Sequence, residues 1–166
     1  MIALTSFLVG FGVVSALAAQ ASSPAERDKA EVIAVVQKFF DALASHDEAA
    51  LSATLLPDGL VRSMREDKGE WTLRTVSFGE TVRSLSANPS RLLERMWDPD
   101  VRIYGRIATL AAPYDFHVDG AFSHCGTDLF QLVKNADGWR ISGLLYTVQR
   151  SGCTPSPLGP PGGRKD

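Results

Sequence analysis

The residues best suited to acid–base chemistry lie in the last third of the chain, at Tyr104, Asp115 and His124. A carboxylate or an imidazole can act as a general base, and a phenol hydroxyl can donate a hydrogen bond to a developing oxyanion. Asp115 follows Pro113, and a bulge there could turn Asp115 toward an interior site. The alternative is a surface loop in which Asp115 only favours a turn. The three residues are therefore candidates for catalysis.

His124 and Asp128 lie in a segment with alternating apolar residues and share the parity of Phe130. If the segment is a strand, both side chains point to one face. Residues four apart along a strand are about 13 Å apart, since the rise is roughly 3.3 Å per residue, so the two cannot form a direct catalytic pair. Each could contact a ligand separately, or His124 could be a core histidine bonded to the backbone.

Aromatic residues complete the predicted pocket. Tyr114 borders the proline in the same region as Asp115, and Phe40 and Trp97 are candidate apolar walls. Binding pockets are commonly lined by aromatic side chains with a few placed polar groups. Trp97 could equally well pack in the core.

Composition narrows the choice of partners. The chain has 17 Lys and Arg against 19 Asp and Glu, a formal net charge of −2, without a basic patch that would favour a nucleic acid. His46, His117 and His124 have no chelating spacing, and no glycine-rich nucleotide motif or G-x-S-x-G motif occurs. We expect neither a metal nor a cofactor.

The two cysteines, Cys125 and Cys153, are a candidate disulfide. If the Cys125 segment pairs with the last strand across a tight turn, Val148 lies near Cys125, and Cys153 lies roughly 16 Å farther along an extended chain. A bridge needs Cα atoms within about 7 Å, hence a chain reversal at Ser151-Gly152. Two separate buried thiols are the alternative.

The two ends of the chain differ from its middle. Residues 7–17 form an uncharged apolar run followed by small residues through Ala21, which is typical of a cleaved export signal and shorter than the roughly 20 residues of a spanning helix. Residues 154–166 are rich in Pro and Gly, which favours disorder. We predict a signal peptide at 1–21, a domain at 22–153 and a tail at 154–166. The protein is then periplasmic or secreted, with no membrane partner after signal removal.

Three helix starts share one pattern, a Ser followed three residues later by Glu, as in a capping box. The serines are Ser23, Ser45 and Ser77. They predict helices over about 24–44, 47–55 and 78–87, the second ended by Pro57-Asp58-Gly59. Alternating segments predict strands at 60–65, 71–76, 91–97, 101–111, 121–133 and 139–150, with a break at 113–115.

Helices segregated from a consecutive antiparallel meander indicate an α+β fold. Only one helix is long enough to cover the sheet. We therefore expect a cone-shaped, curled antiparallel sheet wrapped over the N-terminal helices, a cystatin-like α+β roll. Such a curl leaves a cavity wherever side chains do not fill the interior.

Two long segments resemble one known group of proteins. The helical opening VIAVVQKFFDALASHDEAALSATLLPDGLV and the closing HCGTDLFQLVKNADGWRISGLLYTVQR resemble the nuclear transport factor 2-like superfamily, in its SnoaL-like and ketosteroid-isomerase-like branch. The resemblance covers roughly residues 25–150. It implies a cone with a pocket, frequent homodimers, and a mixture of enzymes and noncatalytic binders, so it does not assign a chemistry.

Three hypotheses follow, and whether the protein is an enzyme is left open. The first is an exported, noncatalytic domain that binds a small apolar or amphipathic molecule, as a homodimer. The second is an isomerase-like or cyclase-like enzyme with Asp115 or His124 as base and Tyr104 as electrophile. The third is a structural or interaction module with a filled core. The presence and lining of a cavity distinguish them.

Overall fold

The structure is a computed structural model that describes residues 23–161. The export signal predicted at 1–21 lies outside the described residues. Within residues 23–161, no helix combines the length and the apolar character needed to cross a membrane.

Three helices precede or interrupt the sheet, at the places that the sequence predicts. They are α1 (Pro24–Ser45), α2 (Glu48–Thr54) and α3 (Phe78–Ser86). Ser23 caps α1 by accepting from the Glu26 amide at 3.2 Å, and Ser77 and Glu80 form a complete capping box on α3. The cap predicted for α2, Ser45, is wrong. Its cap is Asp47, because His46 adopts a left-handed conformation that ends α1 only after Ser45.

Within the described part of the chain, seven strands form one sheet. They are β1 (Leu55–Asp67), β2 (Glu70–Ser77), β3 (Leu92–Met96), β4 (Asp100–Tyr104), β5 (Ile107–Val118), β6 (Ala121–Asn135) and β7 (Gly138–Val148). Their order is β2-β1-β7-β6-β5-β3, with β4 also paired to β5. Neighbours are antiparallel except β1 and β7, which run parallel. The predicted α+β fold is confirmed, and the sheet is mixed because β1 enters beside the last strand.

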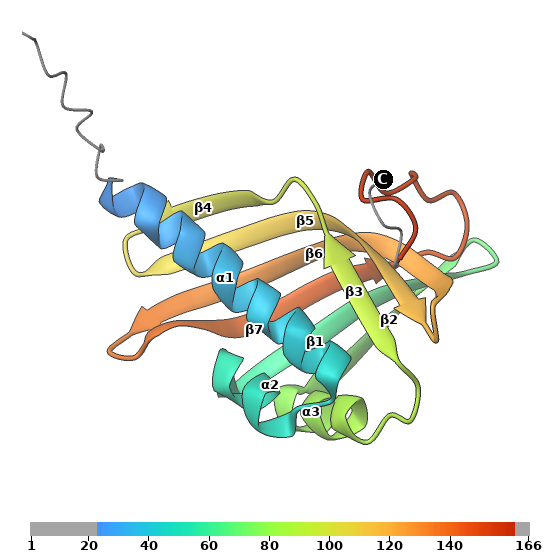
Figure 1. The fold of residues 1–166 in the computed structure, drawn as a ribbon, viewed down its shortest axis with the longest axis horizontal. Coiled ribbons are helices and arrows are strands. Elements are labelled where there is room, and N and C mark those ends of the chain that lie inside the picture. Colours follow the sequence, from blue (N-terminus) through green and yellow to red (C-terminus); the bar gives the residue numbers. More distant parts are fainter. Residues whose placement is uncertain (1–22, 162–166) are drawn as a thin grey trace, which may run out of the picture.

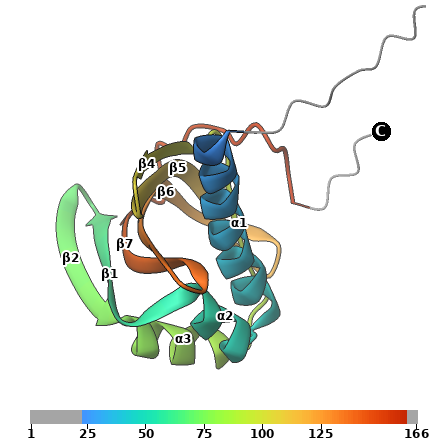
Figure 2. The same cartoon turned by 90° about the vertical axis from the view of Figure 1, so that its left-hand side faces the viewer.

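The sheet curls around α1. Figure 1 shows α1 lying across the face formed by β5, β6 and β7, and Figure 2 shows the sheet curving around that helix. The contact is aromatic: the rings of Phe39 and Phe40 pack edge-on against Phe130, with centroids 6.1 and 5.9 Å apart. All three side chains are buried. The apolar stripe of α1 thus fixes the helix to the concave face.

The segment predicted as one strand at 101–111 is two strands. Gly105 adopts a φ of 64°, a conformation that favours glycine, and the chain reverses so that Tyr104 pairs with Ile107. The break predicted at Pro113 is also wrong, since β5 runs through it and pairs Pro113 with Thr127. The irregularity lies farther on, between Phe116 and His117.

Pro57-Asp58-Gly59 does not end α2 but lies within β1. The register of β1 against β7 shifts between Leu55 and Leu60. Gly59 is needed there, because a Cβ at this position would lie 2.1 Å from the ring of Phe78. Phe78 is the first residue of α3, so this close approach seats α3 against β1 and closes one end of the cone.

Candidate functional site

A cavity of about 250 Å³ lies between α1, α3 and the concave face of the sheet. Its walls are mostly apolar, and include Phe39, Leu43, Val61, Val76, Phe116 and Leu144. Polar side chains also reach it, including Ser63, Arg65, Glu94, Tyr114, His124, Asp128 and Tyr146. Exposed residues of β2 and α3 border it as well, among them Arg74, Glu80 and Ser84. The interior is therefore hollow, contrary to the expectation of a filled structural module.

Two carboxyl groups meet at the cavity wall, Glu94 from β3 and Asp128 from β6. Asp128 is buried, and its Oδ2 receives no hydrogen bond from any N–H or O–H donor of the described residues. Burial raises the pKa of Glu94 to about 8, although a hydrogen bond with Asp128 opposes the rise. Burial, then the charge of Glu94, raises the pKa of Asp128 well above its ordinary value. At neutral pH the pair therefore retains at least one proton.

His124 is a neutral imidazole beside this pair. Burial, with smaller contributions from the charges of Arg65 and Arg150, lowers its pKa to about 4. The ring stacks on Phe116 with centroids 4.8 Å apart, and Nδ1 lies 3.0 Å from the hydroxyl of Ser123. At neutral pH His124 therefore offers an aromatic face and hydrogen bonding rather than a positive charge.

Two tyrosines contribute to the cavity in different ways. The Tyr114 hydroxyl donates to the carbonyl of Thr147 at 2.7 Å, and burial raises the pKa of Tyr114 beyond its usual range. The hydroxyl proton of Tyr114 is thus already used in a hydrogen bond and is not available to a ligand. The Tyr146 hydroxyl accepts from Arg65 at 3.2 Å, which leaves its own proton available to a ligand. Arg65 also donates to Ser63 at 3.2 Å.

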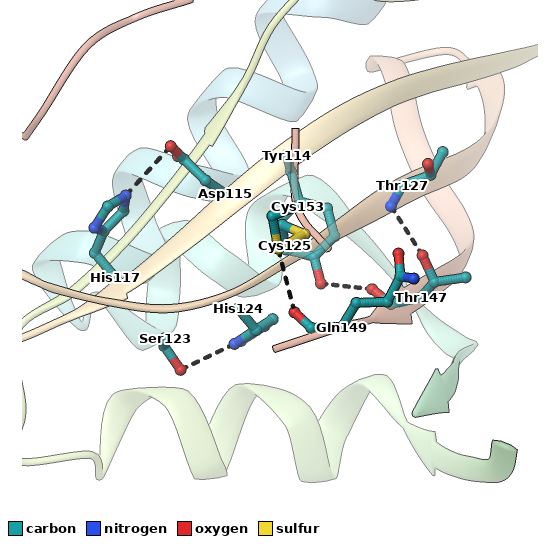
Figure 3. Close-up of a disulfide and its surroundings, with 10 residues drawn as sticks. All are labelled: Tyr114, Asp115, His117, Ser123, His124, Cys125, Thr127, Thr147, Gln149 and Cys153. Atoms are coloured by element: carbon teal, nitrogen blue, oxygen red, sulfur yellow. Dashed lines mark hydrogen bonds and ion pairs between the residues drawn. A yellow bond between two sulfur atoms is a disulfide. The ribbon is translucent and has the colours of Figure 1, made fainter. Parts of the chain in front are cut away.

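Asp115 lies outside the cavity, in a cluster on the opposite face of β5. Its neighbours Tyr114 and Phe116 line the cavity, so alternation turns Asp115 outward. Arg95 donates to both carboxylate oxygens at 2.9 and 2.5 Å, and His117 Nε2 lies 3.3 Å away. Burial alone would raise the pKa of Asp115, but the hydrogen bonds from Arg95 and His117 outweigh it and lower the pKa. Figure 3 shows Asp115 and His117 turned toward each other, separate from the pair of His124 and Ser123.

The structure brings together only part of the predicted site. Tyr114, His124 and Asp128 line the cavity. Phe40, Trp97 and Tyr104 do not: Phe40 is buried against Phe130, Trp97 follows β3, and Tyr104 is 59% exposed at the end of β4. Tyr104 lies outside because the chain reverses immediately after it, so it is not brought together with Asp115 or His124.

Most cavity residues escaped the sequence analysis, among them the polar residues Arg65, Glu94 and Tyr146. The signal for Glu94 was its parity with Leu92 and Met96, which pack in or against the core. That signal is weak, because Arg95 beside it makes a charged residue on either face equally plausible. Arg65 and Tyr146 lie near strand ends, where periodicity gives no direction.

The disulfide between Cys125 and Cys153 is confirmed, with Cα atoms 6.0 Å apart. Cys125 pairs with Gln149, one residue beyond the predicted Val148, and the chain then turns at Gly152, whose φ is 70°. Cys125 also lies directly opposite Asp115 in the register of β5 and β6. The disulfide thus anchors the segment after β7 beside the outer cluster (Figure 3).

Among residues 23–161, no group of three or more His, Cys, Asp or Glu side chains is arranged to hold a metal ion. The cavity offers the acceptors and donors of Glu94, Asp128, His124 and Tyr146 instead. These groups can bind a polar edge of an organic molecule while the apolar walls cover its remainder.

Comparison with known proteins agrees with the fold. Residues 27–147 match the sequence profile of a family described as "Putative lumazine-binding". No curated protein matches the sequence significantly.

Similar solved structures share the cone at low sequence identity. A protein of unknown function with a cystatin-like fold from Nostoc punctiforme is 15% identical, with a TM-score of 0.61, over 75% of this chain and 93% of that chain. A nuclear transport factor 2-like superfamily protein from Salmonella enterica is 13% identical, with a TM-score of 0.61, over 80% and 99%. A protein from Kribbella flavida is 22% identical, with a TM-score of 0.60, over 75% and 93%. At these identities the similarity shows the nuclear transport factor 2-like fold.

Proposed function

We propose that this chain, which belongs to the family described as "Putative lumazine-binding", binds a small amphipathic molecule inside the cone without transforming it. The observation that carries this proposal is the cavity of about 250 Å³ with apolar walls and a few polar groups. Its volume is slightly below the roughly 300–1,000 Å³ of pockets for drug-sized ligands, which favours a ligand of one or two rings. The name of the family supports a heteroaromatic ring.

The test compares two substitutions at neighbouring positions of β7, one that fills the cavity and one on the other face that does not. Leu144 lines the cavity, whereas Leu145 is 43% exposed on the other face of β7. We expect wild type and Leu145→Trp to bind lumazine or an environment-sensitive naphthalene dye, measured by fluorescence titration. Leu144→Trp should lose at least about tenfold in affinity, because the indole occupies the ligand volume. Equal binding by both variants, or no binding of either probe to wild type, would refute the proposal.

A second function, proton-transfer catalysis, is favoured by one observation. The Glu94–Asp128 pair holds a proton near neutral pH inside a cavity, as a general acid or base requires. Its test is deuterium exchange at the α-carbons of 2-tetralone, followed by NMR in D2O. Exchange that is accelerated by wild type and lost in Asp128→Asn would favour catalysis over plain binding.

We also propose that the protein is exported. The disulfide supports this, since disulfides persist in oxidising compartments. Expression of the full sequence in a bacterial host, followed by fractionation and intact mass measurement, tests it. Export predicts a periplasmic chain that begins after Ala18, Ala19 or Ala21. A full-length chain in the cytoplasm would contradict it.

A homodimer is the remaining proposal, and it follows from the family resemblance. Large apolar side chains exposed on the outside, including Tyr104 and Ile107, support it. Light scattering across a concentration series should give twice the mass of one chain. A single-chain mass at the highest soluble concentration would refute the dimer without affecting the binding proposal.

A further inference from the structure

Within residues 23–161, the carboxyl pair of the cavity has no positive partner. Glu94 and Asp128 contact each other, and no Lys or Arg is among the groups that shift the pKa of either one. Asp128 is 1% exposed and its Oδ2 lacks a donor. A buried carboxylate without a cation or a set of donors is unfavourable by several kcal/mol, so such groups usually find a partner or stay protonated.

Two arginines of the neighbouring strands, Arg95 and Arg65, are engaged elsewhere. Arg95 follows Glu94 in β3, but alternation turns it to the outer face, where it binds Asp115. Arg65 donates to Ser63 and to Tyr146. The outer carboxylate of Asp115 is thus paired with a cation, whereas the carboxyl groups of Glu94 and Asp128 face the cavity without one.

We propose that the cavity selects a compact aromatic cation, with an amidinium or protonated amino-heterocycle head held by Glu94 and Asp128. This inference rests on the proposed binding function and specifies the ligand class. Two N–H groups on one edge can each donate to a carboxylate, and such charge-assisted bonds are roughly twice as strong as neutral ones. Phe116, Leu144 and Phe39 line the cavity beside the pair and would cover the aromatic ring.

Binding of such a cation has a proton balance. The pair holds a proton when the cavity is empty, and the amidinium takes the place of that proton. The proton leaves to solvent, and no covalent bond is made or broken in the ligand. Because deprotonation of the pair precedes the ionic contact, affinity for the cation should rise as the pH increases toward about 8, the pKa of Glu94.

Other titratable groups also line the cavity. They are Arg65 on β1, Arg74 on β2, Glu80 on α3, Tyr114 on β5, His124 on β6 and Tyr146 on β7. The pKa of His124 is lowered to about 4 by burial, and hydrogen bonds from Ser77 lower the pKa of Glu80. The pKa of Tyr114 is raised by burial. From α1 only Phe39 and Leu43 line the cavity, and the charge of Asp115 adds to the rise in the pKa of Glu94. The carboxyl pair is therefore the group expected to lose a proton as the pH rises toward about 8.

The experiment compares three probes of one shape: benzamidine, benzamide and benzoate. Calorimetric titration of the disulfide-bonded full chain near neutral pH, in two buffers of different ionisation enthalpy, gives affinity and proton release together. We expect benzamidine to bind at least about tenfold more tightly than benzamide, with release of a fraction of a proton to one proton, and benzoate to bind least. Asp128→Asn should remove most of this preference and still bind benzamide.

The wild-type measurements need no variant, so misfolding of Asp128→Asn leaves the inference testable. Benzamide or benzoate binding as tightly as benzamidine would overturn it, and a preference for benzoate would indicate an arginine of the cavity, Arg65 or Arg74, as the anchor. Benzamidine binding without proton release would also overturn it. If no probe binds, lumazine and the dye included, the proposed function fails as well. If the dye or lumazine binds and benzamidine does not, only this inference fails.

Discussion

Two carboxyl clusters lie on opposite faces of the same sheet, and they differ in whether a cation compensates their charge. On β3, Glu94 faces the cavity and the next residue, Arg95, faces outward. The outer cluster joins Arg95 to Asp115, with His117 beside them. The inner cluster joins Glu94 only to another acid, Asp128. Glu94 and Arg95 are consecutive in β3, so their side chains point to opposite faces of the sheet. The outer face therefore holds an ion pair, and the inner face holds two acids without a cation.

The difference indicates what each cluster does. The pKa of Asp115 is lowered because its partners favour the charged form, as in a stabilising ion pair. The pKa of Glu94 is raised to about 8 because burial disfavours its charge. The protein thus gives its outer carboxylate a cation and leaves the two inner acids without one. Packing of the core does not require these two acids. Burying acids without a cation lowers stability, and such a loss of stability is typical of functional sites.

The strongest way to break this comparison is to remove the outer cation. Arg95→Met leaves Asp115 buried without its bidentate partner, and we expect a loss of about 3–5 kcal/mol in the free energy of unfolding. Glu94→Gln, on the adjacent position of β3, should cost much less or stabilise, because it removes a buried acid that lacks a cation. Urea unfolding at neutral pH measures both. Equal losses would show that the two clusters are energetically alike.

A disulfide lies beside the outer cluster, and its removal should give the next largest effect. Cys125 and Cys153 close a segment with a sequence separation of 28. Replacing both by Ser should lower the free energy of unfolding by about 3 kcal/mol, through the entropy gained by the unfolded chain. Urea unfolding of the variant beside oxidised and reduced wild type measures it. Ligand affinity in the inner cavity should change little, and a large change would contradict the separation of the two faces.

A smaller effect comes from pH and has opposite signs on the two faces. The folded chain holds a proton on Glu94 up to about pH 8, whereas an ordinary Glu loses it near 4.5. This contribution to stability is complete below about pH 4.5 and is lost as the pH rises to about 8. We expect a decline of about 2 kcal/mol, less than an isolated group would give because the two acids share a proton.

Thermal unfolding of wild type and Glu94→Gln at several pH values measures that decline. The variant should show a smaller decline, because only the buried Asp128 then contributes to it. The lowered pKa of Asp115 acts in the other direction, since its contribution is present above the ordinary pKa of an Asp and disappears on acidification. A wild-type stability that rises from about pH 5 to about pH 8, with Glu94→Gln unchanged from it, would contradict the assignment.

The fold could be predicted from the sequence because its signals are local and repeated. Ser23 and Ser77 mark helix starts with caps that need no tertiary context. The apolar stripe of α1 and the long alternation of β6 then determine which surfaces meet. The parallel pairing of β1 with β7 was missed, because nothing local in either strand encodes a partner so far away along the chain.

The site was predictable only where parity was clear. The parity with Phe130 put His124 and Asp128 on one common face, because β6 is long and regular there, but it left open whether that face is the concave one. Phe122 shares that parity but lies outside, since the irregular register opposite His117 changes the face. Glu94 was missed because a five-residue strand with charges at successive positions leaves its inner face undetermined.

The smallest expected effect tests why the inner acids remain unpaired. Arg65 is held by Tyr146 and by Ser63, so its guanidinium is oriented before any ligand arrives. Tyr146→Phe removes one acceptor, and we expect about 1 kcal/mol less stability, the usual worth of one hydrogen bond. Because Ser63 still binds Arg65, the pH range over which Glu94 lowers the stability should not change. Thermal unfolding of Tyr146→Phe over the same pH series measures both quantities. A decline in stability that moves to lower pH would mean that the freed guanidinium of Arg65 had turned to the two acids. Tyr146, rather than the strand geometry, would then keep the two faces different.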